Sequence, residues 1–206
     1  MIRQILAEAG PAEAVRHLLG ARLVHGSVSA RIIEVEVYLG SDDPGSHAFR
    51  AVTPRNRTMF GPAGHAYVYR SYGCHWMLNV VLGPEGSPGA LLIRAAEPLA
   101  GISLMEERRG SRQHLLDGPG RLAQAFGLSG EHDGIDLLES GDPRLEPESS
   151  AEAIGWTRRI GLAAGRGDDF VWRAILPGSK GLSRSERTLP PEPHPWPSLP
   201  PAWSES

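Results

Sequence analysis

The hydrophobic pattern of the first forty residues changes from a helical period to a strand period. Apolar residues three and four apart occupy positions 12–19, after Pro11 and before Gly20, which predicts a short helix. The stretches 22–29 and 30–39 instead have the apolar, alternating spacing of β-strands. The chain is therefore expected to pass from one short helix into a dense β region.

A second β region contains an aromatic connection. Residues 65–71 and 76–82 have the spacing of two strands, and Tyr67 and Tyr69 lie on one face of the first. Residues 72–74, Tyr-Gly-Cys, form the connection between them. This pattern predicts a β-hairpin with an aromatic side chain near its tip.

The remaining pattern alternates loops, helices and short strands. Residues 40–64 form a loop rich in Asp, Pro, Gly and Arg, and loops of that length in compact domains usually carry function. After the hairpin, we expect a strand at 90–94, helices at 97–109 and 118–126, and a polar loop at 141–150. Two short strands are expected at 158–162 and 170–174.

Length and composition favour one domain with a Pro-rich tail. The chain has 206 residues and 40% hydrophobic content, which suits a single domain over 1–188. Seven prolines lie between Leu189 and Trp203, so residues 189–206 cannot form a regular helix or a central strand. This tail is either a partner ligand or an extended strap over the domain.

Targeting signals and cysteines narrow the class further. The N-terminus lacks the apolar core of a secretory signal, and no stretch approaches the roughly 18 apolar residues of a membrane span. We therefore expect a cytoplasmic protein without a membrane partner. Cys74 is the only cysteine, which excludes an intrachain disulfide and disfavours a zinc site. No metal or other cofactor is expected.

Charge is distributed unevenly along the chain. The net charge is −3, yet the segment 44–84 has no Asp or Glu and carries Arg50, Arg55, Arg57 and Arg70. A polyanion would be attracted to that one region, while the acidic remainder would repel it. The alternative is that the four arginines are simply solvated.

Two carboxylates on one strand are the first candidates for chemistry. Glu36 lies in the apolar run IIEVEVY, where a charge is costly unless it is paired or used. Glu34 is two residues away and so shares its face. The pair resembles the acid and base of a glycosidase, but an ion pair with a nearby arginine, or one catalytic and one structural carboxylate, explains it equally well.

The hairpin aromatic is the second candidate. A large ring at a hairpin connection is hard to bury within its own hairpin, so Tyr72 either folds back onto the sheet or enters a partner. In a locally basic region, the partner would be a base stack with one nucleotide flipped out. Tyr38, His47 and Tyr69 are either ordinary half-buried aromatics or the walls of a nucleobase pocket.

Three sequence runs together resemble one enzyme family. RIIEVEVYLGSDDPGSHAF, TPRNRTMFGPAGHAYVYRSYGCHWMLNVV and ALLIRAAEPLAG are similar in order and spacing to the alkyladenine (3-methyladenine) DNA glycosylases, in their bacterial branch. DGPGRLAQAFGL resembles a later helix start of the family, and RRIGL its C-terminal segment. The likeness covers about 22–174, with departures at Trp76, at 51–52 and at Arg158.

The resemblance implies the residues of the chemical step and of DNA insertion. Glu36 matches the general base, as the second Glu of the E-x-E-x-Y signature, and Arg94 matches the arginine beside the catalytic water. Tyr72 corresponds to the intercalating tyrosine. These positions imply extrusion of a damaged purine followed by hydrolysis of its glycosidic bond.

The resemblance also implies a base pocket and backbone contacts. Tyr38, His47 and Tyr69 match the walls of the pocket, and Asn79 matches the asparagine that crowds out the amine of guanine. Contacts to the DNA backbone are expected from Thr53, Arg55 and Arg121. The fold expected is a single α+β domain with a curved, mostly antiparallel sheet, a protruding β-hairpin and surrounding helices.

The resulting hypothesis is a monomeric repair enzyme that acts on duplex DNA containing damaged purines such as 3-methyladenine, hypoxanthine or ethenoadenine. Lys180 is the only lysine, and bifunctional glycosylases usually cleave the strand through a Schiff base, so we expect base release without lyase activity. The competing hypotheses are a non-catalytic nucleic-acid binding module and a small-molecule nucleosidase that uses Glu34 and Glu36. The sequence does not rank the lesions.

Overall fold

The computed structural model describes residues 1–139, 141–148 and 150–184. The predicted Pro-rich tail, 189–206, lies outside the described residues.

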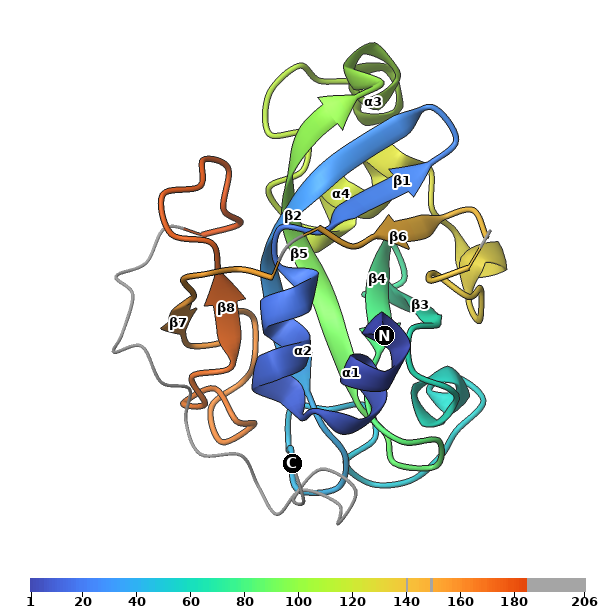
Figure 1. Ribbon diagram of the computed structural model, residues 1–206, viewed down its shortest axis with the longest axis vertical. Coiled ribbons are helices and arrows are strands. Elements are labelled where there is room, and N and C mark those ends of the chain that lie inside the picture. The colour runs from blue at the N-terminus through green and yellow to red at the C-terminus, as the bar shows by residue number, and fades with distance from the viewer. Residues whose placement is uncertain (140, 149, 185–206) are drawn as a thin grey trace.

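A single antiparallel sheet organises the described chain. Its eight strands follow the order β3-β4-β5-β2-β1-β6, with β8 pairing both β2 and β7. The two longest strands, β2 (Val28–Tyr38) and β5 (Ala90–Ala100), run side by side through the middle (Figure 1). The others are β1 (Arg22–His25), β3 (Ala66–Ser71), β4 (His75–Val81), β6 (Arg144–Glu146), β7 (Gly155–Thr157) and β8 (Arg173–Ile175).

The sheet is curved, as predicted, and its irregularities lie beside the candidate carboxylates. Along the β2–β5 ladder the register shifts between Ile32 and Glu34 and again between Glu34 and Val35. Glu34 pairs with Ala95 and Val35 with Ile93, so Arg94 is the extra residue on β5. A bulge bends its strand and redirects a side chain, which accounts for Arg94 facing the carboxylates of β2.

Helices pack on this sheet through apolar faces. The N-terminal pair, α1 (Ile2–Glu8) and α2 (Pro11–Leu18), lies in front of the central strands in Figure 1. α3 (Ile102–Arg109) packs against α4 (Pro119–Phe126), which in turn packs on β4. Two short 3₁₀ turns, η1 (Arg57–Phe60) and η2 (Gly130–His132), complete the described elements.

The predicted helix at 12–19 and the predicted hairpin are confirmed, and several boundaries were wrong. The predicted strand at 22–29 is broken by a turn at 26–27, where Gly26 has a φ of 54°. The helix predicted from residue 97 begins only at Ile102, because β5 continues to Ala100 and Gly101 takes a left-handed φ of 72°.

The C-terminal predictions need the largest corrections. The stretch 141–150, predicted as a loop, contains β6, which pairs with β1. The strand predicted at 158–162 is absent from the described chain, and β7 ends just before it at Thr157. Arg159 is instead buried in an ion pair, which takes its segment out of the sheet. The strand predicted at 170–174 is confirmed in shifted form as β8.

None of the helices described here is both long and apolar enough to cross a membrane.

Candidate active site

A cavity of about 310 Å³ opens beside the hairpin. It brings together six of the predicted site residues, namely Tyr38, His47, Tyr69, Tyr72, Asn79 and Arg94. Further lining comes from Tyr67, Met77, Leu92, Pro119, Ile160 and Leu162. The cavity therefore draws on strands and loops that are far apart in the sequence.

The register of the sheet explains how these side chains meet. Tyr67 pairs with Asn79, Asn79 pairs with Leu92, and Leu92 pairs with Glu36. These four residues form one row across β3, β4, β5 and β2. Side chains on one row of a sheet are neighbours, so the candidate base pocket lies next to the candidate carboxylate.

One wall of the cavity is aromatic. The rings of His47 and Tyr69 meet edge to face with centroids 4.5 Å apart, and Tyr67 and Tyr69 are 5.3 Å apart. The Nδ1 of His47 lies 2.9 Å from the hydroxyl oxygen of Tyr67. Burial raises the pKa of Tyr69 to about 12, so its hydroxyl stays protonated near neutrality. The wall offers flat, uncharged surfaces to a planar ligand.

The loop 40–64 is ordered around a buried asparagine and holds His47 in place. The side-chain nitrogen of Asn56 donates to the carbonyls of His47 and Ala51 at 2.8 and 2.9 Å. Its oxygen accepts from the backbone nitrogen of Thr53 at 2.6 Å. Burial, and secondarily the charge of Arg55, lowers the pKa of His47, which keeps the imidazole neutral at pH 7.

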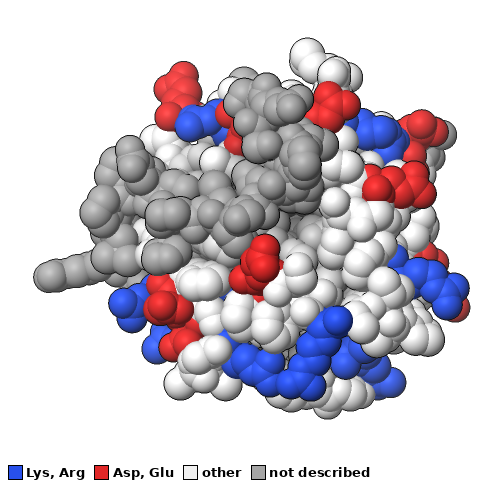
Figure 2. Space-filling model, turned by 90° about the horizontal axis from the view of Figure 1, so that it is seen from below, with Lys and Arg blue, Asp and Glu red and all other residues white. Residues whose placement is uncertain are grey.

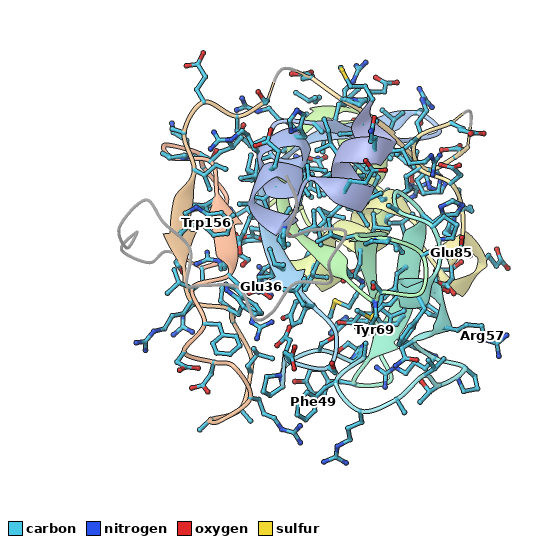
Figure 3. The ribbon with its side chains drawn as sticks, turned by 60° about the horizontal axis from the view of Figure 1, so that its bottom comes forward. Glu36, Phe49, Arg57, Tyr69, Glu85 and Trp156 are labelled. Atoms are coloured by element: carbon cyan, nitrogen blue, oxygen red, sulfur yellow. The ribbon has the colours of Figure 1, made fainter. Side chains whose placement is uncertain are left out.

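Glu36 lies behind the cavity, at the end of β2, and is 0% exposed. One of its oxygens accepts from the backbone nitrogen of Ile160 at 2.7 Å. The other accepts from the hydroxyl of Tyr38 at 2.8 Å and from Nη1 of Arg94 at 3.1 Å. All three donors belong to residues that line the cavity. Figure 3 shows Glu36 and Tyr69 inside the molecule, whereas Arg57 extends outward from its edge.

Arg94 joins the two carboxylates of β2. Its Nε lies 3.0 Å from Glu34 and its Nη1 lies 3.1 Å from Glu36, and its side chain is nearly buried. Burial alone would lower the pKa of Arg94, but the charges of Glu36 and Glu34 outweigh it and raise the pKa. The arginine is therefore a fixed positive charge at the cavity wall. Glu36 is both ion-paired and next to the cavity, so the ion pair expected from the sequence does not exclude the expected position beside a reaction site.

A second buried ion pair lies behind Tyr38. The two terminal nitrogens of Arg159, Nη1 and Nη2, each donate to Asp43 at 2.7 Å, and neither side chain is exposed. The guanidinium carbon of Arg159 lies 4.7 Å from the centroid of the Tyr38 ring. Gly45 leaves room for it, since a Cβ there would come within 2.8 Å of the Arg159 Nη2. This packing fixes the ring of Tyr38 at the cavity.

Asn79 is held as part of the cavity wall. Its side-chain nitrogen donates to the carbonyl of Tyr67 at 2.9 Å, and the residue is almost wholly buried on β4. The hydrogen bond orients the amide, so that a base entering the cavity meets a fixed polar group.

Tyr72 projects from the hairpin tip. It is 88% exposed and has a φ of 49°, and Gly73 follows with a φ of 71°. The Cys74 nitrogen donates to the Ser71 carbonyl at 3.1 Å and closes the turn. A left-handed backbone is unusual for a bulky residue, and functional sites are where such strain is found. Tyr72 does not fold back onto the sheet.

The predicted backbone contacts surround the cavity without lining it. The guanidinium of Arg55 donates to the carbonyl of Arg70 at 3.0 Å and lies 5.4 Å from the ring centroid of Tyr69. Arg121 pairs with Asp117 at 2.8 Å at the start of α4 and stays about half exposed. Thr53 is exposed. Figure 2, viewed from the end where the loop 40–64 lies, shows basic side chains gathered along one edge.

Several residues of the site were not among the predictions. Tyr67 shares a strand face with Tyr69, a signal visible in the sequence, but no role was assigned to it. Asp43 and Arg159 pair across 116 positions, and the backbone of Ile160 reaches Glu36 across 124 positions, so no local pattern reveals them. Within the part of the chain that the structure describes, no three His, Cys, Asp or Glu side chains cluster as metal ligands.

The arrangement is suited to one kind of chemistry. A flat ring can stack on the aromatic wall, and a buried carboxylate, Glu36, and a fixed cation, Arg94, lie at the adjacent edge. An exposed aromatic side chain, Tyr72, stands at the mouth. These features match hydrolysis at a flipped-out nucleotide.

Comparisons with known proteins agree with this geometry. The family model described as methylpurine-DNA glycosylase matches residues 6–180. A relative from Agrobacterium fabrum is 48% identical over 177 residues, covering 84% of this chain and 86% of its own. Relatives from Chlorobaculum tepidum and Methanoculleus marisnigri are 44% and 45% identical, covering 85% and 82% of this chain and 87% and 91% of their own. All three have names of the 3-methyladenine DNA glycosylase type. The chain belongs to the methylpurine-DNA glycosylase family and is thus a DNA N-glycosylase, an enzyme of the hydrolase class.

Proposed function

We propose that this protein releases alkylated and deaminated purines from duplex DNA by hydrolysing the N-glycosidic bond. The observation that carries the proposal is a buried carboxylate, Glu36, directly behind an aromatic cavity that has an exposed tyrosine at its mouth. The proposed substrates are purines of the 3-methyladenine, hypoxanthine and ethenoadenine type, whose flat rings suit the uncharged aromatic wall of the cavity.

Extrusion of the nucleotide is the first step. Unstacking a base costs a few kcal/mol, and a ring inserted into the gap offsets part of that cost. Tyr72 is exposed on the left-handed turn at the hairpin tip, which supports our assignment of its ring as the group that fills the gap. A damaged base pairs less well and costs less to extrude, which supplies part of the selectivity.

Recognition in the cavity is the second step. The rings of Tyr38, His47 and Tyr69 contact the purine by stacking or edge to face, and they favour an electron-poor alkylated base. Asn79 excludes guanine through a clash with its exocyclic amine, since the amide is fixed by its bond to Tyr67. Discrimination therefore depends on repulsion of the normal base as well as attraction to the damaged one.

Hydrolysis is the third step. Glu36 accepts a proton from water as the water oxygen bonds to C1′ of the sugar, and the bond between C1′ and the base nitrogen breaks with its electron pair leaving on the base. A carboxylate has about four lone-pair sites, so the three donors that already bind Glu36 leave capacity for the water proton. Its negative charge also stabilises the oxocarbenium-like sugar.

Strand cleavage is not part of the proposed reaction. A lyase needs an amine that forms a Schiff base with the sugar, and Lys180, the single lysine, does not line the cavity. We expect intact strands with an abasic site until alkali is added. Breaks formed by the purified enzyme without alkali would contradict a monofunctional reaction.

Binding to DNA rests on the surface around the cavity. Arg55, Arg121 and Thr53 contact phosphates on either side of the flipped nucleotide, and the protein acts as a monomer on DNA in the cytoplasm. Arg55→Ala should weaken binding to lesion-bearing and undamaged duplexes alike, because phosphate contacts carry no sequence information. A single species of monomer mass on a sizing column is the expected state in solution.

The form of the substrate tests the proposal against its alternatives. The purified protein is incubated with a duplex holding one hypoxanthine or one 3-methyladenine, and in parallel with inosine. A repair glycosylase releases the base from the duplex and leaves inosine intact. Release from inosine at a comparable rate would favour a nucleosidase that uses Glu34 and Glu36, and no release from any substrate would leave only a binding module.

A further inference from the structure

Glu34 is a buried carboxylate that does not line the cavity, and the reaction above gives it no role. It is 0% exposed, and its two oxygens accept from Arg94 Nε at 3.0 Å, Arg173 Nε at 2.7 Å, the Ser183 nitrogen at 2.7 Å and the Ser183 hydroxyl. Burial raises the pKa of Glu34, but Arg173, Ser183 and Arg94 together outweigh it and lower the pKa. Glu34 is therefore charged at neutral pH.

The guanidinium of Arg94 is held at two edges. Its Nε is shared between Glu34 and the hydroxyl of Ser183, at 3.0 and 3.2 Å, and its Nη1 binds Glu36 at 3.1 Å. Among the described residues nothing accepts a hydrogen bond from Nη2, and Arg94 lines the cavity. Because a guanidinium is planar, fixing Nε and Nη1 also fixes the direction of Nη2.

Ser183 reaches this cluster from a segment that follows β8. The segment is attached to the sheet by the bond from the Leu176 nitrogen to the Ile33 carbonyl, 3.0 Å long. Arg173 also donates to the carbonyl of Arg184 at 2.6 Å. Glu34 and Ser183 are 149 positions apart, so the late chain supplies a contact that β2 cannot make by itself.

We propose that Glu34 and Ser183 are positioning residues that hold the Arg94 guanidinium with one nitrogen on Glu36 and another directed into the cavity. This inference rests on the proposed function and identifies the residues that orient Arg94 for that reaction. Neither carboxylate of β2 lines the cavity itself. All three donors to Glu36 belong to cavity-lining residues, whereas among the donors to Glu34 only Arg94 lines the cavity. We therefore assign Glu34 no acid or base role, because it reaches the cavity only through Arg94.

The loss of Glu34 would change the geometry in a defined way. Without the Glu34 carboxylate, Nε keeps only the neutral Ser183 hydroxyl as its acceptor. Arg94 can then rotate and offer two nitrogens to Glu36, because the bidentate pair is the preferred arrangement of arginine and carboxylate. The lone pairs of Glu36 that should accept the water proton would then be occupied. The chemical step would slow, whereas the surfaces that bind DNA would be unchanged.

The test compares three variants in single-turnover base release from a hypoxanthine duplex with enzyme in excess. Hydrogen-bond partners that orient metal ligands typically contribute roughly 10-fold to 100-fold to affinity or activity, and we apply the same range to the partners of Arg94. We expect Ser183→Ala to lower the rate about 10-fold and Glu34→Gln about 100-fold, with the Kd for the duplex within about twofold of the parent. Ser179→Ala is the matched control, because the Ser179 hydroxyl binds no described residue, and it should retain the parental rate.

A double-mutant cycle separates positioning from support of the fold. In an Arg94→Gln background the guanidinium is already gone, so adding Glu34→Gln or Ser183→Ala should cause no further loss per folded molecule. The inference would be overturned if the rate loss of the double variant equalled the product of the two single-variant losses. An unchanged rate in Ser183→Ala would also overturn it. If Glu34→Gln does not fold, the Ser183→Ala cycle decides the question alone.

The outcomes also separate this inference from the proposed function. If Glu36→Gln is inactive while Glu34→Gln and Ser183→Ala release base at the parental rate, the proposed function stands and the positioning role fails. If the parent enzyme releases no base from any lesion duplex, the proposed function fails first.

Discussion

Removal of the Tyr72 ring should separate folding from function at the hairpin tip. The side chain is 88% exposed and its backbone has a φ of 49°, so it contributes little packing and carries backbone strain. The left-handed region costs an L-residue about 1–2 kcal/mol, and Asn tolerates it better than Tyr. Tyr72→Asn should therefore leave the free energy of unfolding unchanged or raise it by up to about 1 kcal/mol.

The effect on base release should be large and should depend on stacking. One aromatic contact with a base contributes about 1–3 kcal/mol. At about 1.4 kcal/mol per factor of ten, losing it lowers the population of flipped nucleotide roughly 5-fold to 150-fold. Both Tyr72→Asn and Tyr72→Ala should show this loss in single-turnover release from a fully paired hypoxanthine duplex, with unfolding followed by circular dichroism.

A second substrate tests the physical reason. In a duplex whose lesion lies within an unpaired bubble, there is less stacking to replace, so the loss on removing Tyr72 should shrink markedly. An equal loss on paired and bubble substrates would mean that Tyr72 acts by some other route. An undiminished rate on the paired duplex would refute the wedge itself.

Three further predictions concern the cavity walls. Asn79→Ala should increase release of undamaged guanine and, by leaving the Tyr67 carbonyl without its donor, cost about 1–3 kcal/mol of stability; unchanged guanine release in a duplex assay would contradict the clash. Gly45→Ala should lower the melting temperature, at a cost of about 1–3 kcal/mol, because its Cβ would lie 2.8 Å from the Arg159 Nη2 and 2.9 Å from the carbonyl oxygen of Arg166; an unaltered melting temperature would show that both neighbours can move aside at little cost. Because the pKa of His47 is lowered in the folded protein, the unfolded chain binds the proton first as the pH falls. The contribution of His47 to the free energy of unfolding is therefore complete above about pH 6.5 and is lost as the pH falls toward the folded-state pKa. The unfolding free energy of the parent minus that of His47→Gln should therefore fall from pH 8 to pH 5. A difference that grows over this range would contradict the lowered pKa of His47.

Local pattern was sufficient where an element is periodic and capped. The helix at 12–19 has Pro at its start and Gly at its end, and the hairpin has alternating strands around a Tyr-Gly turn, so both were predicted near their true bounds. The segment 158–162 has apolar residues of strand type, but Arg159 is drawn into a buried pair with Asp43. A tertiary charge pair overrode the local preference there.

The site was predictable only in part for the same reason. The sequence placed Glu36 in an apolar strand and Tyr72 at a hairpin tip, and the structure shows a buried carboxylate and an exposed ring. Strand periodicity cannot show that Arg94 is the extra residue of a bulge, which is why it reaches both Glu34 and Glu36. Contacts that close over more than a hundred positions, such as Ser183 with Glu34, leave no local signal.

The most direct test of the account is base release by Glu36→Gln. The amide has nearly the shape of the carboxylate but cannot accept the water proton, so binding should survive while chemistry stops. We expect the variant to bind a hypoxanthine duplex with a Kd close to that of the parent and to release the base at least about 100-fold more slowly in a single turnover, within the range that general base catalysis contributes. Base release at the parental rate by a folded Glu36→Gln protein would contradict the central claim.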